Sequence, residues 1–351
     1  MDGTVGFFDG HNDALLRLAL YARRDPERSF LEGRPDGHID LPRARRGGML
    51  GGLFALYAPS ATGLRFDQFR GTSYDCPLPP EVPLADAQQI ILKQTSILTR
   101  IVAASEGQVV LCRSVGEIRS AIAADRFAIV LHLEGAEAID ADLHALDVLH
   151  AAGLRSLGPV WSRTNIFGHG VPMRFPSSPD TGPGLTAAGA GLVRACNRLR
   201  ILVDLSHITE QGFWDVARLS DAPLVATHSN VHALCPSSRN LTERQLDAIR
   251  DSDGLVGLNL ATCFLRPDGQ MRADTDLDIV VRHVAQLIEH LGETRVGLGS
   301  DFDGAVVPNS VGSVAGAQAI FRALAAGGFG SDLLQKFAIG NWMRVLALTI
   351  G

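Results

Sequence analysis

The sequence of 351 residues predicts an α/β fold in which eight parallel strands and the helices between them close into a (β/α)8, or TIM, barrel. Eight short apolar runs alternate with segments whose apolar residues recur at helical spacing. The run at residues 127–134 is too continuously apolar for a half-exposed sheet and suits a parallel strand buried on both faces. The alternative, an open doubly wound sheet, would carry a glycine-rich dinucleotide loop after an early strand, and none is present.

The expected elements follow in chain order. Strands are predicted at residues 6–11, 53–57, 127–134, 154–160, 201–207, 223–228, 254–260 and 296–301. Helices are predicted at residues 15–23, 84–104 and 276–291, after Ser114 (in a capping box with Glu117), after Thr186 and through Phe213. Two long segments rich in glycine and proline, at about 58–83 and 161–185, are expected to be loops, and loops of that length are usually functional. We expect a single domain over residues 1–351.

Composition excludes several classes of protein. The apolar fraction of 46% and the charged fraction of 20% suit a globular protein with a large core. The net charge is −6 and no basic cluster stands out, so nucleic acid is not an expected partner. The sequence contains neither a signal-peptide pattern nor an apolar stretch of 18 residues, which indicates a cytoplasmic protein without a membrane partner. The five cysteines are odd in number and far apart, so we expect free thiols, several of them buried.

Metal-ligand types stand at or just after the ends of five predicted strands. In a barrel these ends meet on one face, where catalytic groups lie. The residues are His11, Asp13, Glu134, His207, His228 and Asp301. Imidazoles and carboxylates suit Zn²⁺ and other divalent first-row ions, and a catalytic zinc needs only three protein ligands. Two metal ions that share a carboxylate would use the whole set.

Each of these residues alone has an ordinary explanation. A single histidine at a strand end is more often a hydrogen-bonded structural residue, and Glu134 could cap a helix or pair with a buried cation. The segment at residues 301–304 could be a turn, and it lacks the full pattern of a calcium loop. That all five strand ends carry a metal-ligating residue type by chance is far less probable than any single case. The set therefore predicts a metal site more strongly than any one of its residues does.

Several motifs resemble those of the membrane (renal) dipeptidase family, in that family's order. The family comprises zinc dipeptidases of the amidohydrolase-like barrel group, and the chain looks like a bacterial-type soluble member. The motifs are Asp9-Gly10-His11-Asn12-Asp13, Leu133-Glu134-Gly135, Val203-Asp204-Leu205-Ser206-His207, Thr227-His228-Ser229-Asn230, Ser238-Arg239-Asn240 and Gly299-Ser300-Asp301-Phe302-Asp303-Gly304. The similarity covers nearly the whole chain, and its His-x-Asp opening is specific because most related barrel hydrolases open with His-x-His.

The resemblance implies a role for each residue of the set. His11 and Asp13 would bind one Zn²⁺, His207 and His228 a second, and Glu134 would bridge both. Asp301 would exchange protons with the metal-bound water and the leaving amine. Arg239 would pair with the C-terminal carboxylate of a dipeptide, a task that its planar guanidinium suits.

One position departs from the family pattern. Many members carry a histidine just after the fourth strand, thought to help polarise the scissile carbonyl, and Trp161 stands there. Tryptophan can stack and donate its ring N–H but cannot carry positive charge. Arg163 or His169 could take over that role, or the metal could suffice. His132 shares the register of Glu134 and could lie behind the ligands. The remaining histidines are expected to be surface or packing residues: His38, His144, His150, His232, His283 and His290.

The leading hypothesis is a cytoplasmic binuclear zinc dipeptidase, with a D-residue at the C-terminal position of the substrate as one option. Two close metal ions would lower the pKa of a bridging water toward about 7 and polarise the carbonyl group. One rival is another metal-dependent hydrolase on the same barrel that cleaves an amide, a lactone or a β-lactam. A second is a non-catalytic metal-binding protein, which the presence of Asp301 disfavours. The oligomeric state is open, and a homodimer is one option.

Overall fold

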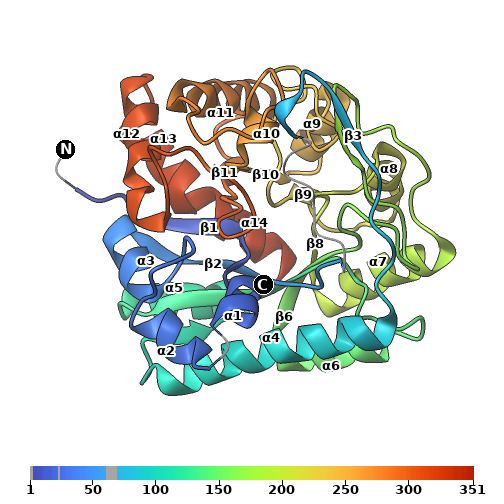
Figure 1. The fold of residues 1–351 in the computed structure, drawn as a ribbon, viewed down its shortest axis with the longest axis horizontal. Coiled ribbons are helices and arrows are strands. Elements are labelled where there is room, and N and C mark those ends of the chain that lie inside the picture. Colours follow the sequence, from blue (N-terminus) through green and yellow to red (C-terminus); the bar gives the residue numbers. More distant parts are fainter. Residues whose placement is uncertain (1–2, 23, 61–68) are drawn as a thin grey trace.

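Eight parallel strands form the barrel, as the sequence predicts (Figure 1). The structure, a computed structural model, describes residues 3–22, 24–60 and 69–351. The strands are β1 (Phe7–Asn12), β2 (Met49–Tyr57), β5 (Phe127–Glu134), β6 (Leu154–Gly158), β8 (Leu202–Val203), β9 (Val225–Ala226), β10 (Leu255–Leu258) and β11 (Val296–Leu298). Continuous ladders join β1-β2-β5-β6-β8 and β9-β10-β11, and a further short parallel strand outside the eight, β4 (Val109–Leu111), pairs with the start of β5. A third, smaller sheet pairs β3 (Tyr74–Cys76) with β7 (Met173–Phe175).

Helices lie around the barrel (Figure 1). They are α1 (Ala14–Tyr21), α2 (Pro26–Leu31), α3 (Leu41–Gly47), α4 (Leu84–Ala104), α5 (Val115–Ala123), α6 (His144–Ala152), α7 (Ala187–Leu199), α8 (Glu210–Leu219), α9 (Glu243–Asp251), α10 (Thr262–Leu265), α11 (Leu277–Leu291), α12 (Gln318–Ala326), α13 (Ser331–Gln335) and α14 (Asn341–Thr349). The helix starts predicted at Ser114 and Thr186 are confirmed, and their hydroxyls accept from backbone N–H groups of α5 and α7. The capping box predicted for Ser114 and Glu117 is only half formed, because the Glu117 carboxylate accepts from the N–H of Arg113. No helix among the described residues is long and apolar enough to cross a bilayer.

Two seams in the barrel are held by buried aspartates instead of a strand ladder. Single bridges join residue 204 to Val225, between β8 and β9, and Asn12 to Phe302, between β11 and β1. At the second seam Asp9 accepts from the N–H (2.8 Å) and the hydroxyl (2.9 Å) of Ser300. At the first, Asp204 accepts from the N–H and the hydroxyl of Thr227, both at 2.7 Å. Because charged acceptors form the stronger hydrogen bonds, these carboxylates close the barrel where the ladders stop.

The two segments expected to be long loops each contain a short strand. Cys76 pairs with Met173 and Tyr74 with Phe175 in the antiparallel ribbon β3–β7. Three-residue strands are too short to show an alternating pattern, and their partners lie about a hundred residues apart in the chain. Residues 61–68 of the first predicted loop lie outside the described residues. None of the five cysteines forms a disulfide, as predicted, and all five are buried.

Trp342 of α14 fills the interior of the barrel against β1, β10 and β11. Its ring is buried, and its indole N–H donates to the Leu298 carbonyl at 2.9 Å. Glycines make room for it, because a Cβ would meet the ring at each of three positions, Gly10, Gly257 and Gly297. The ring belongs to a cluster of buried side chains inside the barrel that includes Phe8, Leu53, Val130 and Leu255, here called the inner core. The larger cluster that includes Phe7, Phe54 and Leu131 is called the outer core. Because the interior is filled here, an open site is left at the C-terminal ends of the strands.

Trp342→Ala should lower the free energy of unfolding by about 3–5 kcal/mol, since it removes a buried aromatic ring and leaves a cavity. The shift in the urea unfolding midpoint measures this effect. Leu348→Ala is the control, because Leu348 lies on the same helix but is exposed, and it should change stability by no more than about 0.5 kcal/mol. Equal effects of the two substitutions would contradict the packing role given to Trp342.

Candidate metal centre and substrate cavity

A bulge in β1 turns His11 into the barrel. Phe8 faces the inner core, and strict alternation from Phe8 would point His11 outward. The pairing of β1 with β2 shifts register between Asp9 and Asn12, so that Asn12 aligns with Phe54, a residue of the outer core. One extra residue reverses the alternation, and His11 and Asp13 therefore share the inward face. The sequence predicted the shared face but not the bulge that aims it inward.

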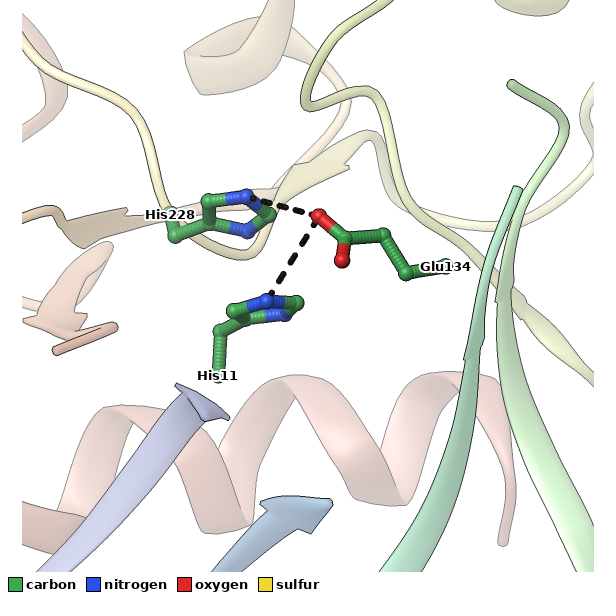
Figure 2. Close-up of side chains that lie close together, drawn as sticks. All are labelled: His11, Glu134 and His228. Atoms are coloured by element: carbon green, nitrogen blue, oxygen red, sulfur yellow. Dashed lines mark ion pairs between the residues drawn. The ribbon is translucent and has the colours of Figure 1, made fainter. Parts of the chain in front are cut away.

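Glu134 lies at the centre of the predicted ligand set. It is the last residue of β5, and its Oε1 is 3.6 Å from Nε2 of His11, 3.1 Å from Nε2 of His207 and 3.5 Å from Nε2 of His228. Figure 2 shows this carboxylate facing the rings of His11 and His228. The Nε2 atoms of His207 and His228 are 3.1 Å apart. Three imidazoles and one carboxylate thus present their polar atoms to a common point.

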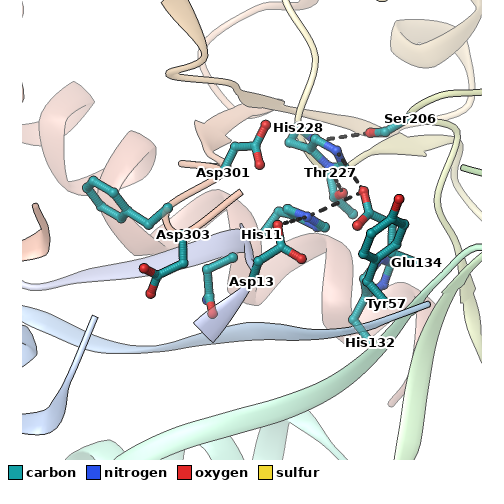
Figure 3. Close-up of polar contacts among 12 residues, drawn as sticks. His11, Asp13, Tyr57, His132, Glu134, Ser206, Thr227, His228, Asp301 and Asp303 are labelled. Carbon is teal, nitrogen blue, oxygen red and sulfur yellow. Dashed lines mark hydrogen bonds and ion pairs between the residues drawn. The ribbon is translucent and has the colours of Figure 1, made fainter. Parts of the chain in front are cut away.

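Two carboxylates extend the set beside His11. Oδ2 of Asp13 lies 3.7 Å from Nε2 of His11, and Asp301 offers a further oxygen within 4.8 Å of both. Figure 3 shows Asp13 and Asp301 on one side of His11 and Glu134 on the other. The six residues predicted from the strand ends therefore meet in one cluster, in which five are buried and Asp301 is partly exposed.

The nitrogen and oxygen atoms of these six residues, here called the donor set, suit divalent cations. Both ring nitrogens of His11 are buried, and neither has a hydrogen-bond partner among the described residues. The Oδ1 atom of Asp13 is likewise buried without a hydrogen-bond partner. Buried polar atoms are normally satisfied, so unpaired ones that face each other indicate a missing partner. Ligands of a tetrahedral zinc at about 2.0–2.1 Å lie about 3.4 Å from one another, close to the separations observed here.

Electrostatics divides the histidines into two kinds. Burial opposes charge on His11, but the carboxylates of Glu134 and Asp13 outweigh it and raise the pKa of His11 to about 10. Burial, reinforced by Arg239 and His11, lowers the pKa of both His207 and His228 well below the usual value. A neutral imidazole keeps a lone pair that can bind a metal. The charge drawn to His11 shows that the carboxylates favour a cation at this point.

Asp301 is held in an uncommon conformation. Its φ of 59° lies in the left-handed region, as does that of His207 at 71°. Such conformations cost on the order of 1–3 kcal/mol and concentrate at functional sites. Asn259 donates to Oδ2 of Asp301 at 3.0 Å, and burial raises the pKa of Asp301 to about 6. Asn259 was not singled out from the sequence, because a lone asparagine after a strand carries no pattern.

Arg239 is a buried cation without a carboxylate partner. One Nη donates to the His228 carbonyl at 3.2 Å, and the guanidinium lies over the Phe264 ring at 5.3 Å. Its Nε has no hydrogen-bond partner, and it forms no ion pair with any described residue. Burial lowers its pKa. Since an unpaired buried charge is costly, this guanidinium is suited to a ligand that brings a carboxylate.

A cavity of about 610 Å³ opens above the donor set. Trp161 lies in its wall, 5.1 Å from the ring of Tyr57 and 5.6 Å from that of His207. Further lining residues come from the ribbon and from α10, namely Cys76, Met173, Cys263 and Phe264. The lining is thus mostly apolar, with polar groups at the ligand residues and at Arg17, Ser60 and Asp303.

The two other candidates for the position of the family histidine are engaged elsewhere. Arg163 is buried and bonded to Glu137, with nitrogen–oxygen distances of 3.1 and 3.0 Å. Nδ1 of His169 contacts the Gly184 carbonyl at 3.0 Å. Neither lines the cavity, whereas Trp161 does.

Hydroxyl groups behind the histidines were also missed from the sequence. Ser162 lies 2.8 Å from Nδ1 of His207, and Thr227 lies 2.8 Å from Nδ1 of His228. Each contact leaves Nε2 facing the donor set. His132, suggested as a residue behind the ligands, lies edge-on to His11 at 5.4 Å between ring centroids, and its Nδ1 contacts Ser156 at 2.8 Å. Serine and threonine are too common for single residues to have been noticed.

Comparisons with known proteins agree with this geometry. Residues 3–349 match the family described as membrane dipeptidase, peptidase family M19. A crystal structure of a metallopeptidase from Rhodobacter sphaeroides, liganded with a phosphinate mimic of the dipeptide L-Ala-D-Ala, superposes with a TM-score of 0.97; it is 50% identical and the match covers 99% of this chain and 100% of that one. An uncharacterized protein in the pqqA 5′ region of Klebsiella pneumoniae is 48% identical over 74% of this chain and 96% of its own length. An uncharacterized protein in the PQQ-III 3′ region of Acinetobacter calcoaceticus is 42% identical over 82% and 90%.

Proposed function

Because the chain belongs to the membrane dipeptidases of peptidase family M19, and is therefore a metal-dependent dipeptidase, we propose that it binds two Zn²⁺ ions and hydrolyses small dipeptides with a D-residue at the C-terminal position. The family, the barrel fold and the hydrolase class predicted from the sequence are confirmed. The number and identity of the metals, the residue roles and the substrate are the proposal. The observation that carries it is the unpaired Arg239 guanidinium beside the donor set, bonded to the His228 carbonyl.

His11 and Asp13 would hold one ion, His207 and His228 the other, and Glu134 both. The position of Glu134 supports this arrangement, since one of its oxygens faces three imidazoles at 3.1–3.6 Å. When bound, such ions polarise a carbonyl group and make water a better nucleophile. The buried site excludes bulk water, which strengthens these interactions.

Arg239 would pair with the terminal carboxylate of the substrate. Because this guanidinium is buried and bonded to the carbonyl of the ligand residue His228, the contact would select a free C-terminus close to the scissile bond. The L-Ala-D-Ala mimic bound to the Rhodobacter sphaeroides enzyme, which is 50% identical to this chain, supports a small D-residue at that position. Trp161 and Tyr57 would pack on the side chain of the first residue.

Asp301 would move the proton. It lies beside His11 and Asp13, where it can accept a proton from the attacking water and return it to the leaving amine. The amide of Asn259 holds its Oδ2 and leaves the other oxygen available. Proton transfer by a positioned carboxylate fits peptide hydrolysis, in which the amine leaves only when protonated.

Asp301→Asn should keep the metals and reduce kcat by about 10²–10⁴-fold, the typical contribution of a general acid–base group. Steady-state hydrolysis of L-Ala-D-Ala, with metal analysis of the same sample, measures both quantities. Asp332→Asn removes an exposed carboxylate of α13 and should leave both unchanged. A near-native kcat in Asp301→Asn that retains its full metal content would contradict a role in proton transfer.

Arg239→Met should raise the KM for L-Ala-D-Ala by about 30-fold or more, because truncating one side of a buried charge pair costs at least about 2 kcal/mol. The KM for the C-terminally amidated analogue should change much less. Arg244→Met is the matched control, since Arg244 is exposed on α9. Equal loss for free and amidated substrates would show that Arg239 does not read the carboxylate.

A further inference from the structure

Asp204 contacts two hydroxyl groups that both reach His228. Its Oδ2 accepts from the Thr227 hydroxyl at 2.7 Å, and the same hydroxyl lies 2.8 Å from Nδ1 of the His228 ring. Its Oδ1 accepts from the Ser206 hydroxyl at 2.9 Å, and that hydroxyl accepts from the backbone N–H of His228 at 3.1 Å. All four residues are buried, and Figure 3 shows Ser206, Thr227 and His228 side by side.

The direction of each hydrogen bond follows from the number of protons. A threonine hydroxyl has one proton, and a carboxylate can only accept. The Thr227 proton therefore points to Asp204, and the hydroxyl oxygen must accept from His228. The ring nitrogen that faces Thr227 must then carry the ring proton, so a neutral His228 is protonated on Nδ1.

We propose that Asp204, through Thr227, is a positioning residue that fixes the tautomer of His228 so that Nε2 presents its lone pair to the metal centre. This inference rests on the proposed function, in which His228 is a metal ligand. A neutral imidazole has one N–H, and with that proton on Nδ1 the Nε2 atom is free to bind a cation. That Nε2 lies 3.5 Å from Oε1 of Glu134, on the cavity side of the ring.

The other ligand histidines lack this device. Nδ1 of His11 has no hydrogen-bond partner among the described residues. Nδ1 of His207 contacts the hydroxyl of Ser162, whose other neighbour is the weak acceptor Sδ of Met173 at 4.0 Å. No carboxylate therefore sets the direction of the Ser162 proton. The structure thus assigns the fixed tautomer to His228 alone.

Asp204→Asn should reverse the chain of hydrogen bonds without changing its shape. Three donors converge on the Oδ1 position, the Ser206 N–H (3.1 Å), the Ser206 hydroxyl and the Thr227 N–H, so the amide oxygen must lie there. The amide NH₂ then faces Thr227 and donates to its oxygen. The Thr227 proton turns toward His228 Nδ1, and the ring is forced to carry its proton on Nε2.

The test measures Zn²⁺ affinity by chelator competition and the ring tautomer of His228 by ¹⁵N NMR of the metal-free, histidine-labelled chain. Asp204→Asn should lower the affinity for one of the two Zn²⁺ ions by about 10–100-fold, the usual effect of losing the hydrogen-bond partner of a metal ligand. It should also move the ring proton of His228 from Nδ1 to Nε2. Thr227→Val should lower the affinity for the same ion, whereas Thr227→Ser, which keeps the hydroxyl group, should retain the affinity of the unmodified chain. The double variant Asp204→Asn/Thr227→Val should bind Zn²⁺ as tightly as the weaker-binding of the two single variants, because both residues act through the same chain of hydrogen bonds.

Two controls separate this role from barrel closure and from the ligand assignment. Asp9→Asn disturbs the other seam through Ser300, so it should lower the melting temperature without changing the His228 tautomer. If Asp204→Asn only lowers the melting temperature, with Zn²⁺ affinity and tautomer as in the unmodified chain, Asp204 merely closes the barrel and the inference is overturned. If His228→Ala leaves both Zn²⁺ affinities unchanged, the ligand assignment of the proposed function fails instead.

Discussion

The carboxylate of Glu134, 3.1–3.6 Å from three imidazole nitrogens in a site buried from water, is the contact on which the rest of this structure depends. Acceptor and lone-pair atoms do not gather in a protein interior without a positive partner, because burying unpaired polar and charged groups is costly. Asp13 and Asp301 add further negative charge beside it. The elevated pKa of His11 records the same demand for a cation, since the nearby carboxylates keep that ring protonated despite its burial.

The barrel must bring these groups together from strand ends far apart in the chain, and local irregularities do the aiming. A bulge in β1 turns His11 inward, and left-handed backbone conformations set the directions of His207 and Asp301. β8 and β9 are only two residues long, and a single bridge between Asp204 and Val225 takes the place of a ladder between them. Asp204 then closes the seam with hydrogen bonds to Thr227, and in doing so reaches the ring of His228. Barrel closure and ligand orientation therefore use the same carboxylate.

Most of the fold and the main site residues could be predicted because their signals are local. Each candidate metal ligand stands at or just after the end of an apolar run, and eight such runs alternate with helices. The position of these residues at the strand ends therefore indicates where the site lies. What could not be predicted depends on partners. The bulge in β1 is defined only by its register with β2, and Arg163 became a structural residue only through its contact with Glu137. Asn259 and Thr227 act through hydrogen bonds to residues of neighbouring strands, and such contacts leave no periodic pattern in the sequence.

The central claim is that one carboxylate stands between two metal ions. Anomalous diffraction at the zinc edge, from crystals of the chain grown with Zn²⁺, tests it most directly. The account predicts two peaks, one beside His11 and Asp13 and one beside His207 and His228, with Glu134 in contact with both. A single fully occupied peak, or two peaks with Glu134 bound to only one of them, would contradict it.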